Sequence, residues 1–201
     1  MEPAPGTLWN DDLYSVRPGP RGFPAQSVYR GIKLVVFDVD GVLTDGRIII
    51  DDKGTESKFF DVRDGAGITL LRLAGLKVAL ITGRSSAVVD HRAREIKIPP
   101  EYVKQGAKVK LPVLRQMLTE NAMQAQECAF VGDDLIDTDV LEVAGLACCP
   151  TDAHAGAMKQ CHVVANLKGG HGGVRAIAEH ILKTRADGSW EMAVGKYMGK
   201  I

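Results

Sequence analysis

Hydrophobic positions along the chain follow two alternating patterns from about residue 32 onward. The short apolar runs that predict buried strands cover residues 33–38, 77–81, 128–131, 146–148 and 162–164. The longer segments with helical periodicity cover about residues 64–75, 85–96, 108–120, 134–144, 154–160 and 173–184. Strands that alternate with helices predict right-handed crossovers and a largely parallel sheet covered on both faces. The pattern therefore indicates a doubly wound α/β fold.

One segment breaks this alternation. Two strand-like runs, 47–50 and 55–60, flank a turn at 51–54 that ends in glycine, a pattern typical of a β-hairpin. Because the hairpin follows the first strand directly, it could overhang the end of that strand as a small flap. No other insertion is long enough to form a separate cap domain. We therefore expect a site that is open, or that another subunit closes.

Length, composition and net charge limit the classes of protein to which the chain can belong. A length of 201 residues with 45% hydrophobic residues suits one domain with a sizeable core. The 25 basic and 25 acidic side chains leave no net charge, which gives no electrostatic reason to expect nucleic acid or an anionic membrane as a partner. No apolar stretch approaches the roughly 20 residues that a bilayer span requires.

The two ends of the chain differ from its centre. Residues 1–30 are rich in proline and glycine and lack the pattern of a secretory signal, so we expect a poorly ordered extension. A single domain is expected over 31–184, followed by a tail at 185–201 that is too apolar for a fully solvated end. Without C-x-x-C spacing, the cysteines predict buried thiols in a reducing cytoplasm. They are Cys128, Cys148, Cys149 and Cys161.

The first strand ends in the sequence FDVDGVLTDG, which places Asp38 and Asp40 two positions apart. In an extended segment such residues point the same way, so both carboxylates could face one site. A turn is the alternative, because Asp and Gly are favoured turn residues. Ligands of open α/β sheets bind beyond the carboxyl ends of the strands, which is where this pair lies.

Polar and charged residues also follow two other predicted strands and begin one predicted helix. The residues concerned are Thr82 and Arg84 after the strand at 77–81, Asp133, Asp134 and Asp137 after the strand at 128–131, and Lys108 and Lys110 at the helix that begins near 108. A hydroxyl, a lysine and a second acidic group in equivalent positions are not expected to coincide as unrelated turns. The sequence thus favours one polar site at one edge of the sheet.

The combination of D-V-D-G-V-L-T-D-G, T-G-R, a lysine after Q-G, and G-D-D-L-I-D resembles the four motifs of the haloacid dehalogenase (HAD) superfamily of phosphatases. The segments F-D-V-R-D-G-A-G-I (60–68) and G-G-H-G-G-V-R (169–175) resemble its small capless subfamily of 3-deoxy-D-manno-octulosonate 8-phosphate phosphatases. The resemblance covers about residues 31–184. It implies a Rossmann-like fold and hydrolysis of a phosphomonoester through an aspartyl-phosphate.

The resemblance also implies roles for the acidic residues. Asp38 would be the nucleophile, and Asp40 would protonate the leaving oxygen and then activate water. Magnesium would be bound by the carboxylates of Asp38 and Asp133 and the backbone carbonyl of Asp40, since hard oxygen ligands suit this ion. Asp134 and Asp137 would hold Asp133 and the waters of the metal in place. For Asp134, helix capping is compatible with this role.

Two further residues are expected to bind the phosphoryl group. Thr82 can donate a hydrogen bond to a phosphoryl oxygen beside a helix N-terminus. Lys110 matches the lysine that binds the phosphoryl oxygens and fixes Asp38, with Lys108 as the alternative. Relatives often carry Asp or Asn before this lysine, and this chain carries Val109.

The subfamily substrate carries a carboxylate and many hydroxyls, and three residues are expected to bind it: Arg63, Gly65 and Arg84. An arginine can pair bidentately with a carboxylate or a phosphate, although a surface salt bridge is the alternative for both arginines. A sister activity removes the 9-phosphate from a nine-carbon sialic-type sugar and tends to place Glu after Thr-Gly. The Arg84 of this chain favours the eight-carbon acid.

The resemblance implies a cytoplasmic homotetramer that acts in lipopolysaccharide precursor synthesis. In such tetramers the hairpin or the tail of one subunit helps to close the site of its neighbour, and we expect residues 187–201 to do so here. A non-catalytic oligomerisation domain of the same fold is an alternative from another class. The intact set of acidic, hydroxyl and lysine residues argues against it.

Overall fold

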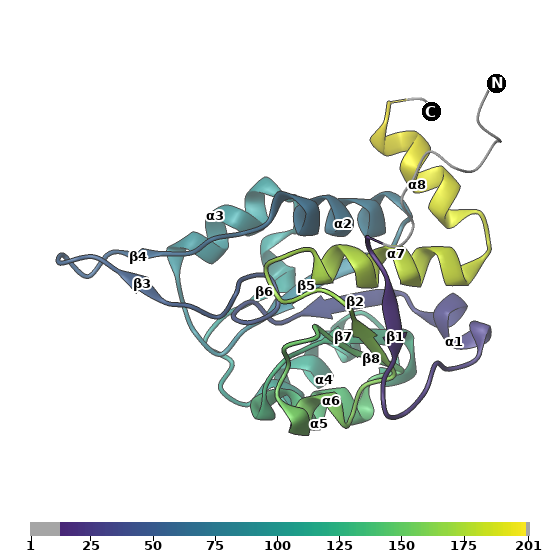
Figure 1. The fold of residues 1–201 in the computed structure, drawn as a ribbon, viewed down its shortest axis with the longest axis horizontal. Coiled ribbons are helices and arrows are strands. Elements are labelled where there is room, and N and C mark those ends of the chain that lie inside the picture. The colour runs from purple at the N-terminus through teal and green to yellow at the C-terminus, as the bar shows by residue number, and fades with distance from the viewer. Residues whose placement is uncertain (1–12, 200–201) are drawn as a thin grey trace.

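A seven-stranded sheet forms the centre of the computed structural model, which describes residues 13–199. The strands lie in the order β1-β9-β8-β7-β2-β5-β6, and every neighbouring pair is parallel except β1 and β9. Figure 1 shows this sheet between two layers of helices. The strands are β1 (Val16–Pro18), β2 (Leu34–Phe37), β5 (Lys77–Ile81), β6 (Val103–Lys104), β7 (Cys128–Val131), β8 (Leu146–Cys149) and β9 (Val163–Ala165).

The sheet divides the hydrophobic core into two parts, one on each of its faces, and helices cover both parts. Along β2, Val35 and Phe37 belong to one part and Leu34 and Val36 to the other, as the period of two in a strand requires. One layer contains α1 (Gln26–Gly31), α2 (Val62–Leu73), α3 (Ala87–Glu95), α7 (Gly173–Arg185) and α8 (Ser189–Tyr197). The other contains α4 (Lys110–Glu120), α5 (Thr138–Val143) and α6 (Ala155–Met158).

The α/β fold predicted from the apolar pattern is confirmed. Each of the five predicted strands is present, and the six predicted helical segments are helical over most of their length. The segment expected at 134–144 begins as a 3₁₀ helix, Leu135–Asp137, and continues as α5. The two-residue strand β6 was not predicted, because it is too short to show a hydrophobic period.

Residues 13–30 differ from the expected poorly ordered extension. Residues 1–12 lie outside the described structure, but from residue 13 onward the chain packs on the domain. β1 pairs antiparallel with β9 at the edge of the sheet, and α1 packs against α7. Tyr29 of α1 is buried, and its hydroxyl lies 3.0 Å from Nε2 of His180. Pairing with an edge strand orders a short segment that has no apolar pattern of its own.

The described part of the tail packs on its own chain, and its expected role at a neighbouring site stays a prediction. Residues Ser189–Tyr197 form α8, which packs against α2 and α7 of its own chain. Trp190 lies partly buried against the core, with the ammonium of Lys183 4.8 Å from the centre of its ring. In Figure 1, α8 and the hairpin lie at opposite ends of the molecule. Part of the apolar surface of the tail is therefore buried in its own domain, whereas Met192, Tyr197 and Met198 remain exposed.

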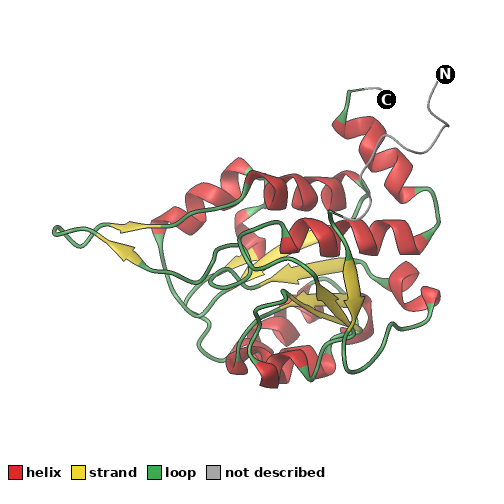
Figure 2. Ribbon diagram, in the orientation of Figure 1, coloured by secondary structure: helices red, strands yellow, loops and turns green. Residues whose placement is uncertain are grey.

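The predicted hairpin is confirmed in a shorter form. β3 (Ile49–Ile50) and β4 (Glu56–Ser57) pair antiparallel in a sheet of their own, and Figure 2 shows them projecting from the body of the domain. No separate cap domain is present within residues 13–199. Among the described residues, none of the helices has both the length and the apolar character needed to cross a membrane.

Candidate active site

The end of β2 holds Asp38 in place. Its backbone N–H donates to the carbonyl of Val131 in the neighbouring strand β7 at 2.9 Å, and its Oδ1 accepts from the N–H of Val39 at 2.7 Å. The residue is only 4% exposed. Since β2 lies between β5 and β7, the ends of those two strands flank Asp38 on both sides.

Three carboxylates and one lysine meet at this edge of the sheet. Oxygens of Asp38, Asp133 and Asp137 lie within 4.8 Å of one another. Nζ of Lys110 lies 2.8 Å from Oδ2 of Asp38 and 2.6 Å from Oδ1 of Asp137, and its side chain is buried. Lys108 is exposed, so the structure places Lys110 in the cluster.

The cluster carries more negative than positive charge. Burial, followed by the charges of Asp38 and Asp137, raises the pKa of Asp133 to about 8. Burial also raises the pKa of Asp38 to about 6, against the opposing attraction of Lys110. Burial disfavours the charged form of Lys110, but attraction to Asp38 and Asp137 outweighs it and raises the pKa of the lysine. The excess negative charge suits an additional cation.

The hydrogen bonds show which carboxylate could hold that cation. Both oxygens of Asp137 are engaged: Oδ1 pairs with Lys110, and Oδ2 accepts from the backbone N–H of Asp133 at 3.1 Å and of Asp134 at 3.3 Å. Oδ1 of Asp133 is buried and has no hydrogen-bond partner among the described residues. A buried oxygen of this kind next to Asp38 fits a hard divalent cation such as magnesium.

Asp134 lies outside this cluster of charges. It is exposed, and its Oδ1 accepts from the N–H of Leu135 at 2.7 Å, which caps the 3₁₀ helix Leu135–Asp137. The capping interpretation therefore describes its observed contact. Asp137 instead fixes both Lys110 and the backbone that carries Asp133.

Gly41 makes room for Asp133. Its φ of +92° lies in the left-handed region, and a Cβ atom there would collide with the carboxylate of Asp133. The glycine-rich loop before α7 lies against the same turn, because a Cβ at Gly169 would collide with the carbonyl of Gly41. The glycine behind the acidic pair is thus a steric requirement of the cluster.

The end of β5 supplies Thr82 and Arg84. Thr82 is buried; its N–H donates to the carbonyl of Lys104 at 3.0 Å, and its own carbonyl accepts from the N–H of Ala107 at 2.9 Å. These bonds tie the end of β5 to the segment that leads into α4. Arg84 is about half exposed, and its guanidinium lies 3.5 Å from Glu56 of the hairpin.

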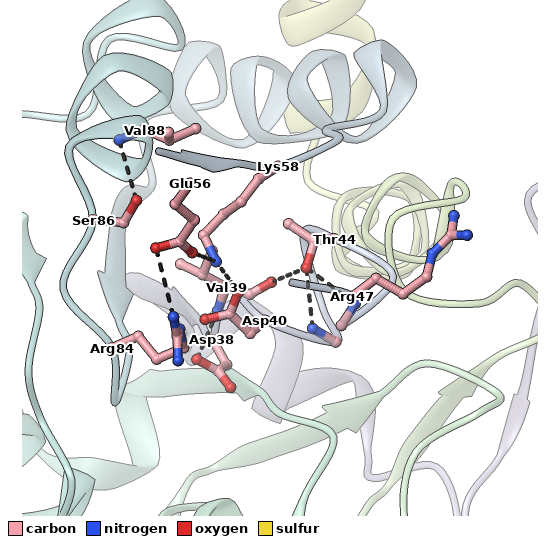
Figure 3. Close-up of polar contacts among 12 residues, drawn as sticks. Asp38, Val39, Asp40, Thr44, Arg47, Glu56, Lys58, Arg84, Ser86 and Val88 are labelled. Atoms are coloured by element: carbon pink, nitrogen blue, oxygen red, sulfur yellow. Dashed lines mark hydrogen bonds and ion pairs between the residues drawn. The ribbon is translucent and has the colours of Figure 1, made fainter. Parts of the chain in front are cut away.

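The hairpin contributes a lysine that sequence reasoning missed. The buried side chain of Lys58 places its ammonium between the carboxylates of Asp40 and Glu56, the latter at 2.8 Å (Figure 3). Burial would lower the pKa of Lys58, but its bonds to Asp40 and Glu56 raise it overall. The alternation of Glu56 and Lys58 along one strand face was the available signal. Asp38 and Asp40 are thus paired with different lysines.

The predicted residues Arg63 and Gly65 lie in the first turn of α2. Arg63 pairs with Asp61, whose carboxylate also caps this helix by accepting from the N–H of Arg63 at 2.7 Å. Gly65 is buried, and a Cβ there would collide with the guanidinium of Arg92 in α3. Gly65 therefore allows close packing of two helices, and the structure does not bring it into the carboxylate cluster.

Between these two residues, Asp64 links α2 to α7. Its carboxylate accepts from the backbone N–H of Gly172 at 3.2 Å and of Arg175 at 2.9 Å, at the start of α7. Burial raises its pKa to about 6 in spite of these bonds. The motif at 60–68 thus meets the motif at 169–175 in space.

Sequence comparison finds relatives with the same name in two bacteria. The chain is 40% identical over 151 residues to the 3-deoxy-D-manno-octulosonate 8-phosphate phosphatase KdsC of Yersinia pestis, covering 75% of this chain and 80% of the relative. It is 38% identical over 165 residues to the protein of the same name from Escherichia coli strain K12, covering 82% and 86%. No protein-family model matches the chain.

Two solved structures share the fold. The 3-deoxy-D-manno-octulosonate 8-phosphate phosphatase of Moraxella catarrhalis, in complex with magnesium, phosphate and KDO, has a TM-score of 0.81 and 35% identity, over 86% of this chain and 97% of that chain. The cobalt-bound deoxy-D-mannose-octulosonate 8-phosphate phosphatase of Haemophilus influenzae has a TM-score of 0.75 and 31% identity, over 79% and 91%.

The parallel sheet, the acidic cluster at its carboxyl-terminal edge and the short flap define a member of the HAD superfamily. This confirms the resemblance drawn from the four motifs. Within that superfamily, the chain belongs to the 3-deoxy-D-manno-octulosonate 8-phosphate phosphatase family, because the similarity extends over most of both chains.

Proposed function

We propose that this protein is a magnesium-dependent phosphomonoesterase that hydrolyses 3-deoxy-D-manno-octulosonate 8-phosphate to the free sugar acid and phosphate. The observation that carries the proposal is the buried cluster in which Lys110 holds Asp38 next to an unpartnered oxygen of Asp133. Relatives that are 40% and 38% identical to this chain over the aligned residues are named for the same activity.

The residues of the cluster can divide the reaction into two steps. Asp38 attacks phosphorus, the bond from phosphorus to the sugar oxygen breaks, and Asp40 gives that oxygen its proton. An aspartyl-phosphate and the free sugar acid result. Asp40, now a carboxylate, then takes a proton from the water that attacks phosphorus, which releases phosphate and restores Asp38.

The charge on the phosphoryl group must be offset during both steps. An ammonium has three donors, and Lys110 uses two of them on Asp38 and Asp137, so one can reach a phosphoryl oxygen. Thr82, buried at the end of β5, supplies a hydroxyl donor. A magnesium ion held by Asp38, Asp133 and the carbonyl of Asp40 would neutralise charge between nucleophile and phosphate. Lys110 and the metal thus share this task.

For the sugar part of the substrate, the structure favours Arg84 over Gly65. Arg84 is half exposed and reaches the hairpin that bears Lys58, so it can pair with a substrate carboxylate at the rim. Arg63 is also exposed in part, but it is engaged with Asp61. We therefore propose Arg84 as the first contact of the sugar acid and Arg63 as a second one.

A substrate panel tests this function. Phosphate release is measured from the eight-carbon 8-phosphate, its nine-carbon 9-phosphate analogue and an aryl phosphate, with magnesium and with a chelator. We expect turnover to require magnesium and to favour the eight-carbon acid. A preference for the nine-carbon acid would move the protein to the sister activity. Absence of turnover for all three would favour a non-catalytic oligomerisation domain.

Magnesium binding is expected to strengthen with pH. The metal requires the ionised carboxylate of Asp133, whose pKa is about 8 without metal. The affinity of the protein for magnesium should therefore fall about tenfold for each pH unit below that pKa. Because this pKa is raised on folding, the metal-free protein loses the corresponding stability as pH rises through about 8. Magnesium should therefore raise the melting temperature far more at about pH 9 than at about pH 6. Equal increases in melting temperature at the two pH values would contradict this prediction.

We further propose a homotetramer located in the cytoplasm. The hairpin and the start of α2 expose large apolar side chains, with Phe59 at 68% and Val62 at 78%, which suits burial against another copy of the chain. The four cysteines are free and buried, as expected in a reducing compartment. The position of α8 on its own domain makes the hairpin the better candidate for closing the site of a neighbour.

A further inference from the structure

We propose that Lys58 is a positioning residue for Asp40: it holds Oδ1 of that carboxylate so that Oδ2 faces the leaving oxygen. This inference rests on the proposed function, in which Asp40 is the proton donor. It adds Lys58, a residue of the hairpin, to the site. The hairpin would therefore help to position a catalytic group as well as cover the site.

The geometry joins three side chains in a row. The ammonium of Lys58 contacts Oδ1 of Asp40 on one side and lies 2.8 Å from Oε1 of Glu56 on the other. Its side chain is fully shielded from solvent, whereas the Asp40 side chain is 21% exposed. Figure 3 shows the side chain of Lys58, the residue after β4, extending toward Asp40. A shielded ion pair of this kind restricts the orientation of the carboxylate.

Hydrogen-bond chemistry then decides which oxygen of Asp40 can act. An ammonium offers three donors and no acceptor, and the carbonyl oxygen of a carboxylic acid accepts a hydrogen bond better than its hydroxyl oxygen, so the contact with Lys58 favours the acidic proton on the other oxygen. In the protonated form of Asp40, this contact therefore favours the proton on Oδ2. Lys58 thus favours one oxygen of Asp40 as the reactive one, while Lys110 holds Asp38.

Glu56 extends this arrangement to the rim of the site. Its Oε2 lies 3.5 Å from the guanidinium of Arg84, and its Oε1 is paired with Lys58. Without the ammonium between them, Asp40 would lose its partner, and its carboxylate would face that of Glu56 and be repelled by it. Asp40 would then turn away from its productive orientation, and a misplacement of about 1 Å can cost on the order of a hundredfold in rate.

The test depends on the leaving group. A sugar phosphate expels a basic alkoxide that needs a proton, whereas an aryl phosphate such as p-nitrophenyl phosphate expels a stable anion that does not. We expect Lys58→Met to lower kcat/KM for sugar phosphates by about tenfold to a hundredfold and for the aryl phosphate by less than about threefold. Lys58→Arg, which retains the charge, should recover part of the loss.

The matched control is Lys53→Met, which removes a lysine exposed in the turn of the same hairpin. It should leave both rates unchanged, and melting temperatures will show whether each variant folds. Equal losses on both kinds of substrate, or no loss on either, would overturn the role of Lys58. A hexose 6-phosphate is included as a second alkyl ester. If the wild type hydrolyses it but not the eight-carbon acid, the substrate assignment fails while the role of Lys58 is still tested.

Discussion

Lys110→Met is expected to lower turnover by at least about a thousandfold and to destabilise the protein. The substitution removes the cation that contacts both Asp38 and Asp137, and it leaves these buried carboxylates without their partner. Removing one member of a buried ion pair costs about 3 to 5 kcal/mol of unfolding free energy. Protonation of the carboxylates can relieve part of this cost, so the loss should be larger at about pH 8 than at about pH 5. Urea unfolding and phosphate release measure the two effects.

Lys108→Met provides the control for this prediction. Lys108 precedes Lys110 by two residues and is exposed, so its loss should change neither stability nor turnover appreciably. If the variant at 108 were the inactive one, the charge assignment of the cluster would be wrong.

Asp38→Asn is expected to abolish turnover, with a loss of about ten-thousandfold or more, because an amide cannot form the aspartyl-phosphate. The metal-free protein should remain folded and become equally or more stable above about pH 6. Burial raises the pKa of Asp38 to about 6, which means that folding disfavours its charged form above that pH. Stability and activity should therefore change in opposite directions, which melting curves and phosphate release can show together.

Asp139→Asn serves as the matched control, because Asp139 is exposed in the first turn of α5. It should retain the activity of the wild type. Substantial turnover by purified Asp38→Asn would contradict the assignment of the nucleophile. A marked loss of stability in that variant would show that the charge of Asp38 is needed for folding.

The fold was predictable where the apolar pattern is strong. Strands such as β2 and β7 are buried on both faces, and their continuous apolar runs show this directly. β1 has no such run, and its order comes from pairing with β9, a contact between segments about 150 residues apart. The sequence likewise shows that the tail is apolar, but only packing against α2 and α7 decides that α8 covers its own chain.

The site was predictable where residues follow strands directly. The carboxyl ends of parallel strands lie at one edge of a sheet. Asp38, Thr82 and Asp133 each follow such a strand, so they could be predicted to lie close together. Lys58 was missed because its place depends on how the hairpin folds back over Asp40, which no strand-end rule contains. Gly65 was assigned to substrate binding by resemblance alone, which stays a prediction, and in the structure it lies against Arg92.

Capture of the phosphorylated enzyme shows directly whether Asp38 is the nucleophile. Magnesium-loaded protein is mixed with 3-deoxy-D-manno-octulosonate 8-phosphate, quenched in acid and reduced with borohydride, which converts an aspartyl-phosphate to homoserine. We expect homoserine at position 38 in the wild type and its absence when substrate is omitted. Rapid phosphate release with an unmodified Asp38, or modification at another aspartate, would contradict this expectation.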